Sequence, residues 1–174
     1  MKSFIPSGYS ALNVSSGDAN LDGLTDIILV LRKNTEETTS NYAEGKPDKR
    51  PLLLLLRQSD GSYKLAIRND NAVECIDCGG IFGDPFVRTT IKNGYFSIEH
   101  GITGGQHWEK ITTFKFSRKK GSWFLYQDHF ISYKFNDSKD PDAEALVKDI
   151  DEVKTVRDFG VVSFDRFDTY KMND

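Results

Sequence analysis

The residues with the clearest chemical potential in this chain are acidic and amide side chains near its start. Residues 18–26 read D-x-N-x-D-G-x-x-D, so oxygen-bearing side chains recur at alternate positions around a tight turn. Ca²⁺ is a hard cation that takes about 6–8 oxygen ligands, and a glycine at position 6 permits the sharp turn that such a loop needs. The pattern therefore predicts a calcium site, with ligands from Asp18, Asn20, Asp22, Asp26 and the backbone carbonyl of Leu24.

The setting of this acidic loop (residues 18–26) excludes an EF-hand. An EF-hand needs a bidentate Glu at position 12 and a helix on each side. Position 12 here is Leu29, within a β-branched-rich segment at 27–31 that predicts a buried strand. A metal-free hairpin turn remains open, because Asp, Asn and Gly favour turns in any case. Calcium is preferred, since three carboxylates within nine residues repel one another without a cation.

Length and composition limit the class of protein. The 174 residues fit a single domain, 1–174, that is long enough to bury a core, and we expect a monomer. The net charge of −3 and the scattered basic residues argue against a nucleic-acid partner. The longest apolar run, 51–56, is too short to span a membrane. No export signal is visible at the start, which is only weak evidence for a cytoplasmic location.

The two cysteines, Cys75 and Cys78, are spaced C-x-x-C. This spacing fits a local disulfide, two buried thiols, or a redox or metal site. A zinc site would need two further soft ligands, and only three histidines remain to supply them. A thioredoxin-like site would need a helix at the first cysteine, whereas residues 79–85, GGIFGDP, form turns. A structural disulfide is the preferred interpretation, and we expect no catalysis from either cysteine.

Dense turn signals predict a fold that is mainly β. The Asn-Gly pair at 93–94 is the strongest hairpin signal, and residues 34–50 are expected to form a long polar loop. The strands are expected at 9–14, 27–31, 51–57, 63–68, 87–92, 95–99, 108–117 and 122–135. The expected architecture is an antiparallel twisted sheet or a two-layer sandwich with blade-like hairpins and one short C-terminal helix.

That helix is predicted over residues 141–151, with its centre at 142–148. Asp140 can cap it, and Pro141 suits a first helical position. Ala145, Leu146 and Ile150 would form a narrow apolar stripe on one side.

The acidic loop and the strand after it carry a family resemblance. Residues 16–32, which contain GDANLDGLTDIILVL, resemble the calcium loop of FG-GAP/VCBS-type repeats, the blades of integrin-like β-propellers. The segment LLLLLRQSDGSYKLAIR resembles the outer half of such a blade, so the resemblance covers about residues 9–70. It implies calcium at the loop. The motif occurs once, and propellers need about four or more four-stranded blades, so we expect no closed propeller.

The whole chain also resembles a group of uncharacterised bacterial exported proteins, of periplasmic or lipoprotein type. The segments that carry this resemblance are RPLLLLLRQSDGSYKLA, CGGIFGDPF and NGYFSIEHG. It implies a periplasmic or secreted location and gives no activity.

An enzymatic alternative rests on a few histidines and carboxylates. The sequence contains no G-x-S-x-G, P-loop, G-x-G-x-x-G or H-E-x-x-H motif. If 95–100 pairs with 107–116, Glu99-His100 would lie near His107 and Glu109 beside the 102–106 connection, where a second metal or a general base could be built. Exposed hairpin ends are the simpler explanation. The adjacent pair Asp128-His129 likewise indicates a strand irregularity more than a dyad.

Three functions follow from these observations. The preferred one is a non-enzymatic, calcium-binding β domain of the bacterial envelope that binds a protein or surface partner. The first alternative is a hydrolase or lyase with a site near His100, His107 and Glu109. The second is a glycan-binding or small-ligand module that uses the abundant aromatic residues, among them Trp108 and Trp123.

Overall fold

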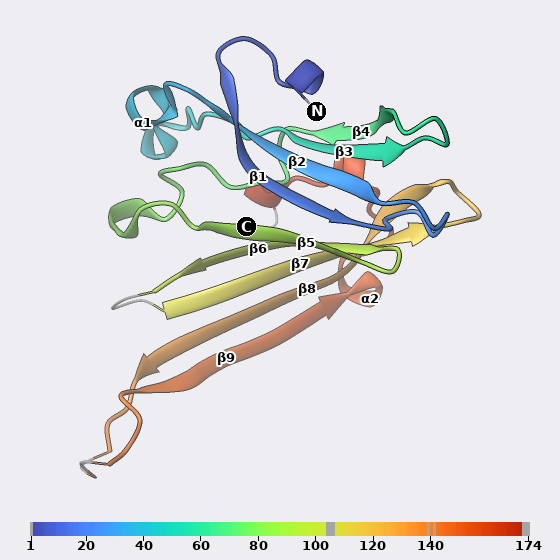
Figure 1. The fold of residues 1–174 in the computed structure, drawn as a ribbon. Coiled ribbons are helices and arrows are strands. Elements are labelled where there is room, and N and C mark those ends of the chain that lie inside the picture. Colours follow the sequence, from blue (N-terminus) through green and yellow to red (C-terminus); the bar gives the residue numbers. More distant parts are fainter. Residues whose placement is uncertain (1, 104–106, 139, 141, 172–174) are drawn as a thin grey trace.

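The computed structural model describes residues 2–103, 107–138, 140 and 142–171, which form two antiparallel sheets packed as a sandwich (Figure 1). The first sheet has four strands in the order β1-β2-β3-β4, and the second has five in the order β5-β6-β7-β8-β9. Strands that are neighbours in a sheet are consecutive in sequence, so each sheet is a meander built from hairpins. The prediction of a mainly β, two-layer fold is confirmed.

The elements follow the turn signals closely. The first sheet contains β1 (Tyr9–Gly17), β2 (Asp26–Lys33), β3 (Leu52–Arg57) and β4 (Tyr63–Asn69). The second contains β5 (Phe86–Lys92), β6 (Tyr95–Ile102), β7 (His107–Ser117), β8 (Ser122–Phe135) and β9 (Leu146–Thr155). The α-helices of the described residues are single turns, α1 (Glu36–Thr39) and α2 (Val156–Phe159). None of the described helices is long and apolar enough to cross a membrane.

The central strands β2 and β3 are apolar on both faces because each face packs on a different cluster. One face, with Val30, Leu52 and Leu54, packs toward the second sheet. The other face buries Leu29 and Leu53 under the N-terminal segment and neighbouring aromatic rings. The run of five leucines therefore has no solvent-facing side over most of its length, as a buried strand requires.

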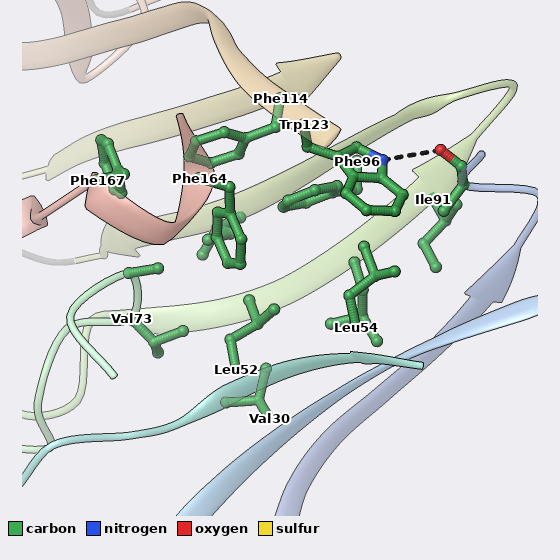
Figure 2. Close-up of a cluster of buried hydrophobic side chains, with 14 of the residues drawn as sticks. Val30, Leu52, Leu54, Val73, Ile91, Phe96, Phe114, Trp123, Phe164 and Phe167 are labelled. Carbon is green, nitrogen blue, oxygen red and sulfur yellow. Dashed lines mark hydrogen bonds between the residues drawn. The ribbon is translucent and has the colours of Figure 1, made fainter. Parts of the chain in front are cut away.

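Between the sheets lies an aromatic core, shown in Figure 2. Phe96 on β6 stacks on Phe114 on β7 with ring centroids 4.9 Å apart, and Phe164 meets both rings edge-on at 5.1 and 5.0 Å. Phe164 and Phe167 come from a segment that follows all nine strands, and the side-chain amide of Asn69 donates to the backbone carbonyls of both. This C-terminal segment thus fills the space between the sheets.

The prediction of a helix at 142–148 is wrong. Residues 146–155 form β9, which pairs with β8 from Leu146 opposite Phe135 to Thr155 opposite Gln127. β8 is 14 residues long, and the edge that does not pair with β7 presents backbone groups that need hydrogen-bond partners. Pairing with this edge overrides the local helix propensity of residues 146–155. The short C-terminal helix is α2 instead, which Thr155 caps, while Pro141 lies outside the described residues.

Candidate functional site

The acidic loop joins β1 to β2 and is shaped by its own side chains. The carboxylate of Asp18 accepts the backbone N–H groups of Leu21 at 2.7 Å and Asp22 at 3.2 Å. Asp22 accepts the N–H of Leu24 at 2.8 Å and the side-chain amide of Asn20 at 2.8 Å. These hydrogen bonds, with Leu21 at a φ of 64°, wind the loop into local turns.

Asp26 differs from the other predicted ligands because it is fully buried. Its carboxylate accepts the backbone N–H of Ala19 at 2.9 Å and that of Arg57, at the end of β3, at 3.0 Å. Burial raises the pKa of Asp26, these two hydrogen bonds lower it, and the negative charges of Asp22 and Asp18 raise it again. The charges of Asp18 and Asp22 therefore both repel that of Asp26.

The acidic loop also connects the two sheets. Its buried residue Ala19 accepts a 2.8 Å hydrogen bond from the indole N–H of Trp123 at the start of β8, drawn as the dashed line in Figure 2. The carbonyl of Asp18 accepts the N–H of Gly94, in the β5–β6 turn, at 2.9 Å. A Cβ at Gly94 would lie 2.8 Å from the side chain of Leu21, so the glycine permits this close approach.

The loop does not form a finished metal centre. Across the described ranges, no three His, Cys, Asp or Glu side chains are arranged to hold a metal ion. In the same part of the chain, Asp18, Asp22 and Asp26 form no ion pair with a Lys, Arg or His side chain. Among the described residues, the carboxylates of the loop are thus met by backbone N–H groups and the side-chain amide of Asn20.

The histidines of the enzymatic alternative lie on opposite faces of the second sheet. The predicted pairing is confirmed, since β6 and β7 run antiparallel from Tyr95 opposite Lys115 to Ile102 opposite Trp108. His100 belongs to the inward-facing set of β6 and is only 2% exposed, whereas His107 lies 3.6 Å from Glu109 on the outer face. Residues 104–106 of the connection lie outside the described residues.

The remaining members of that alternative are also separated. Glu99 lies on the outer face, paired with Arg88 at 2.8 Å. Asp128 points inward and accepts the hydroxyl of Thr112 at 2.6 Å, while His129 points outward to Asp151 at 2.7 Å. The structure therefore assembles neither the proposed His100, His107 and Glu109 site nor an Asp128-His129 dyad.

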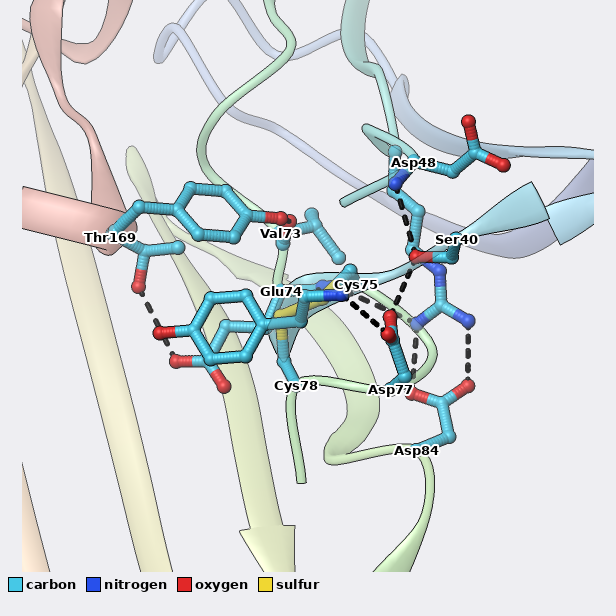
Figure 3. The surroundings of a disulfide bond; sticks show 12 residues. Ser40, Asp48, Val73, Glu74, Cys75, Asp77, Cys78, Asp84 and Thr169 are labelled. Atoms are coloured by element: carbon cyan, nitrogen blue, oxygen red, sulfur yellow. Dashed lines mark hydrogen bonds and ion pairs between the residues drawn. A yellow bond between two sulfur atoms is a disulfide. The ribbon is translucent and has the colours of Figure 1, made fainter. Parts of the chain in front are cut away.

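Cys75 and Cys78 form a disulfide, with Cα atoms 5.1 Å apart, in a loop that packs beside an ion-pair network (Figure 3). The fully buried guanidinium of Arg50 donates to Glu36 at 2.9 and 3.0 Å, and to Asp84 at 2.7 Å through each of two nitrogens. It ties the polar 34–50 loop to the 75–86 loop. Sequence reasoning predicted the 34–50 loop and the turns at 79–85, and it missed the arginine that joins the two segments.

A second polar group is buried on the inner face of the second sheet. Lys110 lies 3.8 Å from Glu74 and 3.3 Å from the hydroxyl of Thr169, and Thr169 lies 3.4 Å from Glu74. The N–H of Glu74 donates to Nε2 of His100 at 3.1 Å. Burial, followed by the charges of Lys110 and Arg50, lowers the pKa of His100 to about 3.

Sequence reasoning did not identify this cluster, because its members come from separate segments. One signal was present: Lys110 occupies an inward position of an alternating strand, between Trp108 and Thr112. Its side chain had to be buried with a partner.

Comparison with protein-family models, with curated proteins and with solved structures gives no match, so the resemblance to FG-GAP/VCBS repeats stays a prediction.

Proposed function

We propose that this protein is a non-enzymatic β-sandwich whose acidic loop binds Ca²⁺ and thereby stabilises the contact between its two sheets. The observation that supports the proposal is the gathering of Asp18, Asp22 and Asp26 in one loop, where the charges of Asp18 and Asp22 repel that of Asp26 and no cationic side chain of the described residues pairs with any of the three. A divalent cation would remove this repulsion, and the residue order supplies oxygens at the spacing calcium prefers.

The ligands would come from Asp18, Asn20, Asp22 and the carbonyl of Leu24. A carboxylate offers about four lone-pair sites, so the backbone hydrogen bonds of Asp18 and Asp22 leave capacity for a cation. The hydrogen bond from the Asn20 amide to Asp22 has to open, because an N–H group cannot face a cation. Asp26, which is buried and accepts two backbone N–H groups, would anchor the loop and close the ligand set directly or through water.

The expected effect is stabilisation. An ion that binds only the folded state contributes RT ln(1 + [Ca²⁺]/Kd), which is about 1.5–2 kcal/mol at 1–2 mM calcium and a Kd of 10⁻⁴ M. That corresponds to a rise in Tm of about 3–8 °C for a domain of this size. The loop holds the hydrogen bond between Ala19 and Trp123, so the ion would support the junction of the sheets.

Two features support a location outside the cytoplasm and a surface partner. The Cys75–Cys78 disulfide is typical of an oxidising compartment, where calcium is also abundant. Among the described strands, β9 leaves an open sheet edge flanked by the exposed apolar side chains of Phe135, Ile150 and Val153. An envelope protein could dock there, as strand edges commonly accept partners.

Calorimetry and thermal unfolding test the calcium proposal. We expect saturable calcium binding to the intact protein, and a Tm that falls when EDTA is added. Asp22→Ala should abolish the calcium-dependent shift and leave a folded protein. Asp60→Ala is the matched control, because Asp60 also accepts a backbone N–H within an exposed turn, yet lies in the β3–β4 connection. Absence of binding, together with a Tm that EDTA does not change, would overturn the proposal.

A further inference from the structure

A pocket of about 370 Å³ opens on the inner face of the second sheet, on the side of β8 and β9. In Figure 1, β9 is the strand of this sheet that lies farthest from the first sheet. The volume is within the range of about 300–1,000 Å³ that is common for small-molecule sites. The pocket walls combine two aromatic rings with charged side chains of both signs.

The aromatic wall consists of Trp108 on β7 and Phe130 on β8. Their ring centroids are 6.1 Å apart and their planes are inclined by 31°, and both side chains line the pocket. Within the described part of the chain, the indole N–H of Trp108 makes no protein hydrogen bond, in contrast to that of Trp123. Trp108 therefore brings an apolar ring and an available N–H donor to the pocket wall.

The charged groups are arranged as neighbouring opposite pairs. Glu74 and Lys110 are 3.8 Å apart at the buried end, and Glu152 and Lys154 are 3.5 Å apart at the exposed rim. Asp128 is 9% exposed, uses one oxygen to accept from a threonine, and lies directly across from Lys154 in the strand register. Three carboxylates and two ammonium groups leave the lining with a net charge of −1.

We infer that this pocket binds a neutral, polyhydroxylated ring of monosaccharide or disaccharide size. A hydroxyl group both donates and accepts, so it can bridge a carboxylate and an adjacent ammonium group with charge-assisted hydrogen bonds. The apolar face of a sugar ring suits a flat aromatic surface. An anion would meet three carboxylates and a cation two ammonium groups, so a ligand without charge loses least on entry.

This site is independent of calcium. The acidic loop contacts Gly94, and the carbonyl of Gly94 accepts the N–H of Phe116 on β7. Lys110, in the pocket, lies six residues away from Phe116 on the same strand. That spacing corresponds to about 20 Å. Sugar binding should therefore persist in EDTA. Failure of calcium to bind the acidic loop would leave sugar binding in the pocket testable, and the reverse also holds.

Saturation-transfer NMR with the intact protein, backed by tryptophan fluorescence, can test the inference. The probes are glucose, galactose, mannose and N-acetylglucosamine, with maltose and cellobiose as disaccharides. Glycine betaine, tetramethylammonium and glucuronate serve as the zwitterionic, cationic and anionic comparisons. We expect saturable binding of at least one neutral sugar, with a Kd of about 1 mM or below, and weaker or no binding of the charged probes.

Three variants locate the bound sugar. Trp108→Ala should weaken binding at least about tenfold, and Asp128→Asn, which keeps the shape of the side chain, should weaken it measurably. Tyr126→Ala is the control, because Tyr126 is an exposed aromatic outside this pocket, at 47% exposure. Asp128→Asn carries the test if Trp108→Ala does not fold. Failure of all neutral sugars to bind, preference for a charged probe, or binding that Asp128→Asn leaves unchanged would overturn the inference.

Discussion

Acidification from pH 6.5 to pH 5 should destabilise this protein through one buried histidine, His100. Its Nε2 accepts the backbone N–H of Glu74 at 3.1 Å, and its Nδ1 is a buried atom without a hydrogen-bond partner within the described residues. A protonated ring could no longer accept that N–H. It would also be a charge buried away from water and a third cation beside Lys110 and Arg50. Burial, followed by the charges of Lys110 and Arg50, therefore lowers the pKa of His100 to about 3 from its ordinary value of 6.5.

The direction of the effect follows from the two states. Above pH 6.5 the imidazole is neutral in both the folded and the unfolded chain, and it adds no pH dependence. Between 6.5 and about 3 the unfolded chain binds a proton at His100 and the folded protein does not, so stability declines as the pH falls. At pH 5 the loss amounts to about 2 kcal/mol, or about 4–8 °C in Tm.

Urea unfolding followed by tryptophan emission, at pH values from 7.5 to 5, measures this loss. The window stops at about pH 5 because carboxylates begin to titrate below it. His100→Gln removes the titrating group while its amide oxygen can still accept the N–H of Glu74. We expect the variant to be less stable at pH 7.5 and to lose less free energy of unfolding on acidification.

His107→Gln is the matched control. It removes a histidine from the outer face and leaves the surroundings of His100 unchanged, so the part of the pH slope that comes from His100 should remain. Equal pH slopes for the parent and His100→Gln would refute the argument that a neutral, desolvated imidazole supplies the pH dependence.

Three further predictions concern buried contacts. Arg50→Met should cost about 3–5 kcal/mol in urea unfolding, because Glu36 would be left charged and buried, and adding Glu36→Leu should restore most of the loss. Trp123→Phe should cost about 1–3 kcal/mol by leaving the carbonyl of Ala19 without its donor, with a Tm decrease in differential scanning calorimetry as the readout. The disulfide should keep the native protein unreactive toward a thiol probe, and reduction should lower stability by about 2 kcal/mol, the value for a four-residue closed loop.

The elements that sequence predicted correctly are those with local causes. Asn93 and Gly94 adopt φ values of 49° and 78°, the left-handed geometry that an Asn-Gly hairpin turn requires, and β5 and β6 lie on either side as expected. β9 was missed because its conformation depends on a partner strand that its own residues do not reveal. Phe164 and Phe167, both deep in the core, were missed because they lie in no regular strand or long helix.

The site residues also divide into those that are close in sequence and those that only the fold brings together. The acidic loop is contiguous, so its spacing is readable directly, whereas Glu74, Lys110 and Asp128 converge only after the sheet has formed. The placement of His100 and His107 on opposite faces could have been predicted from the sequence. His100 shares the inward parity of Phe96, and its partner across the strands is Lys110, so His107 had to point the other way.

The position of the aromatic C-terminal segment has a consequence for synthesis on the ribosome. The side-chain amide of Asn69 donates to the carbonyl of Phe167, which is synthesised 98 residues later. The space between the sheets is therefore not filled until the C-terminal segment has left the ribosome. Until then the inward faces of β2 and β3 are covered only in part, by the side chains of β6, β7 and β8. We therefore expect the nascent chain to depend on holding chaperones and to fold late, in one cooperative step, since long-range contacts close slowly.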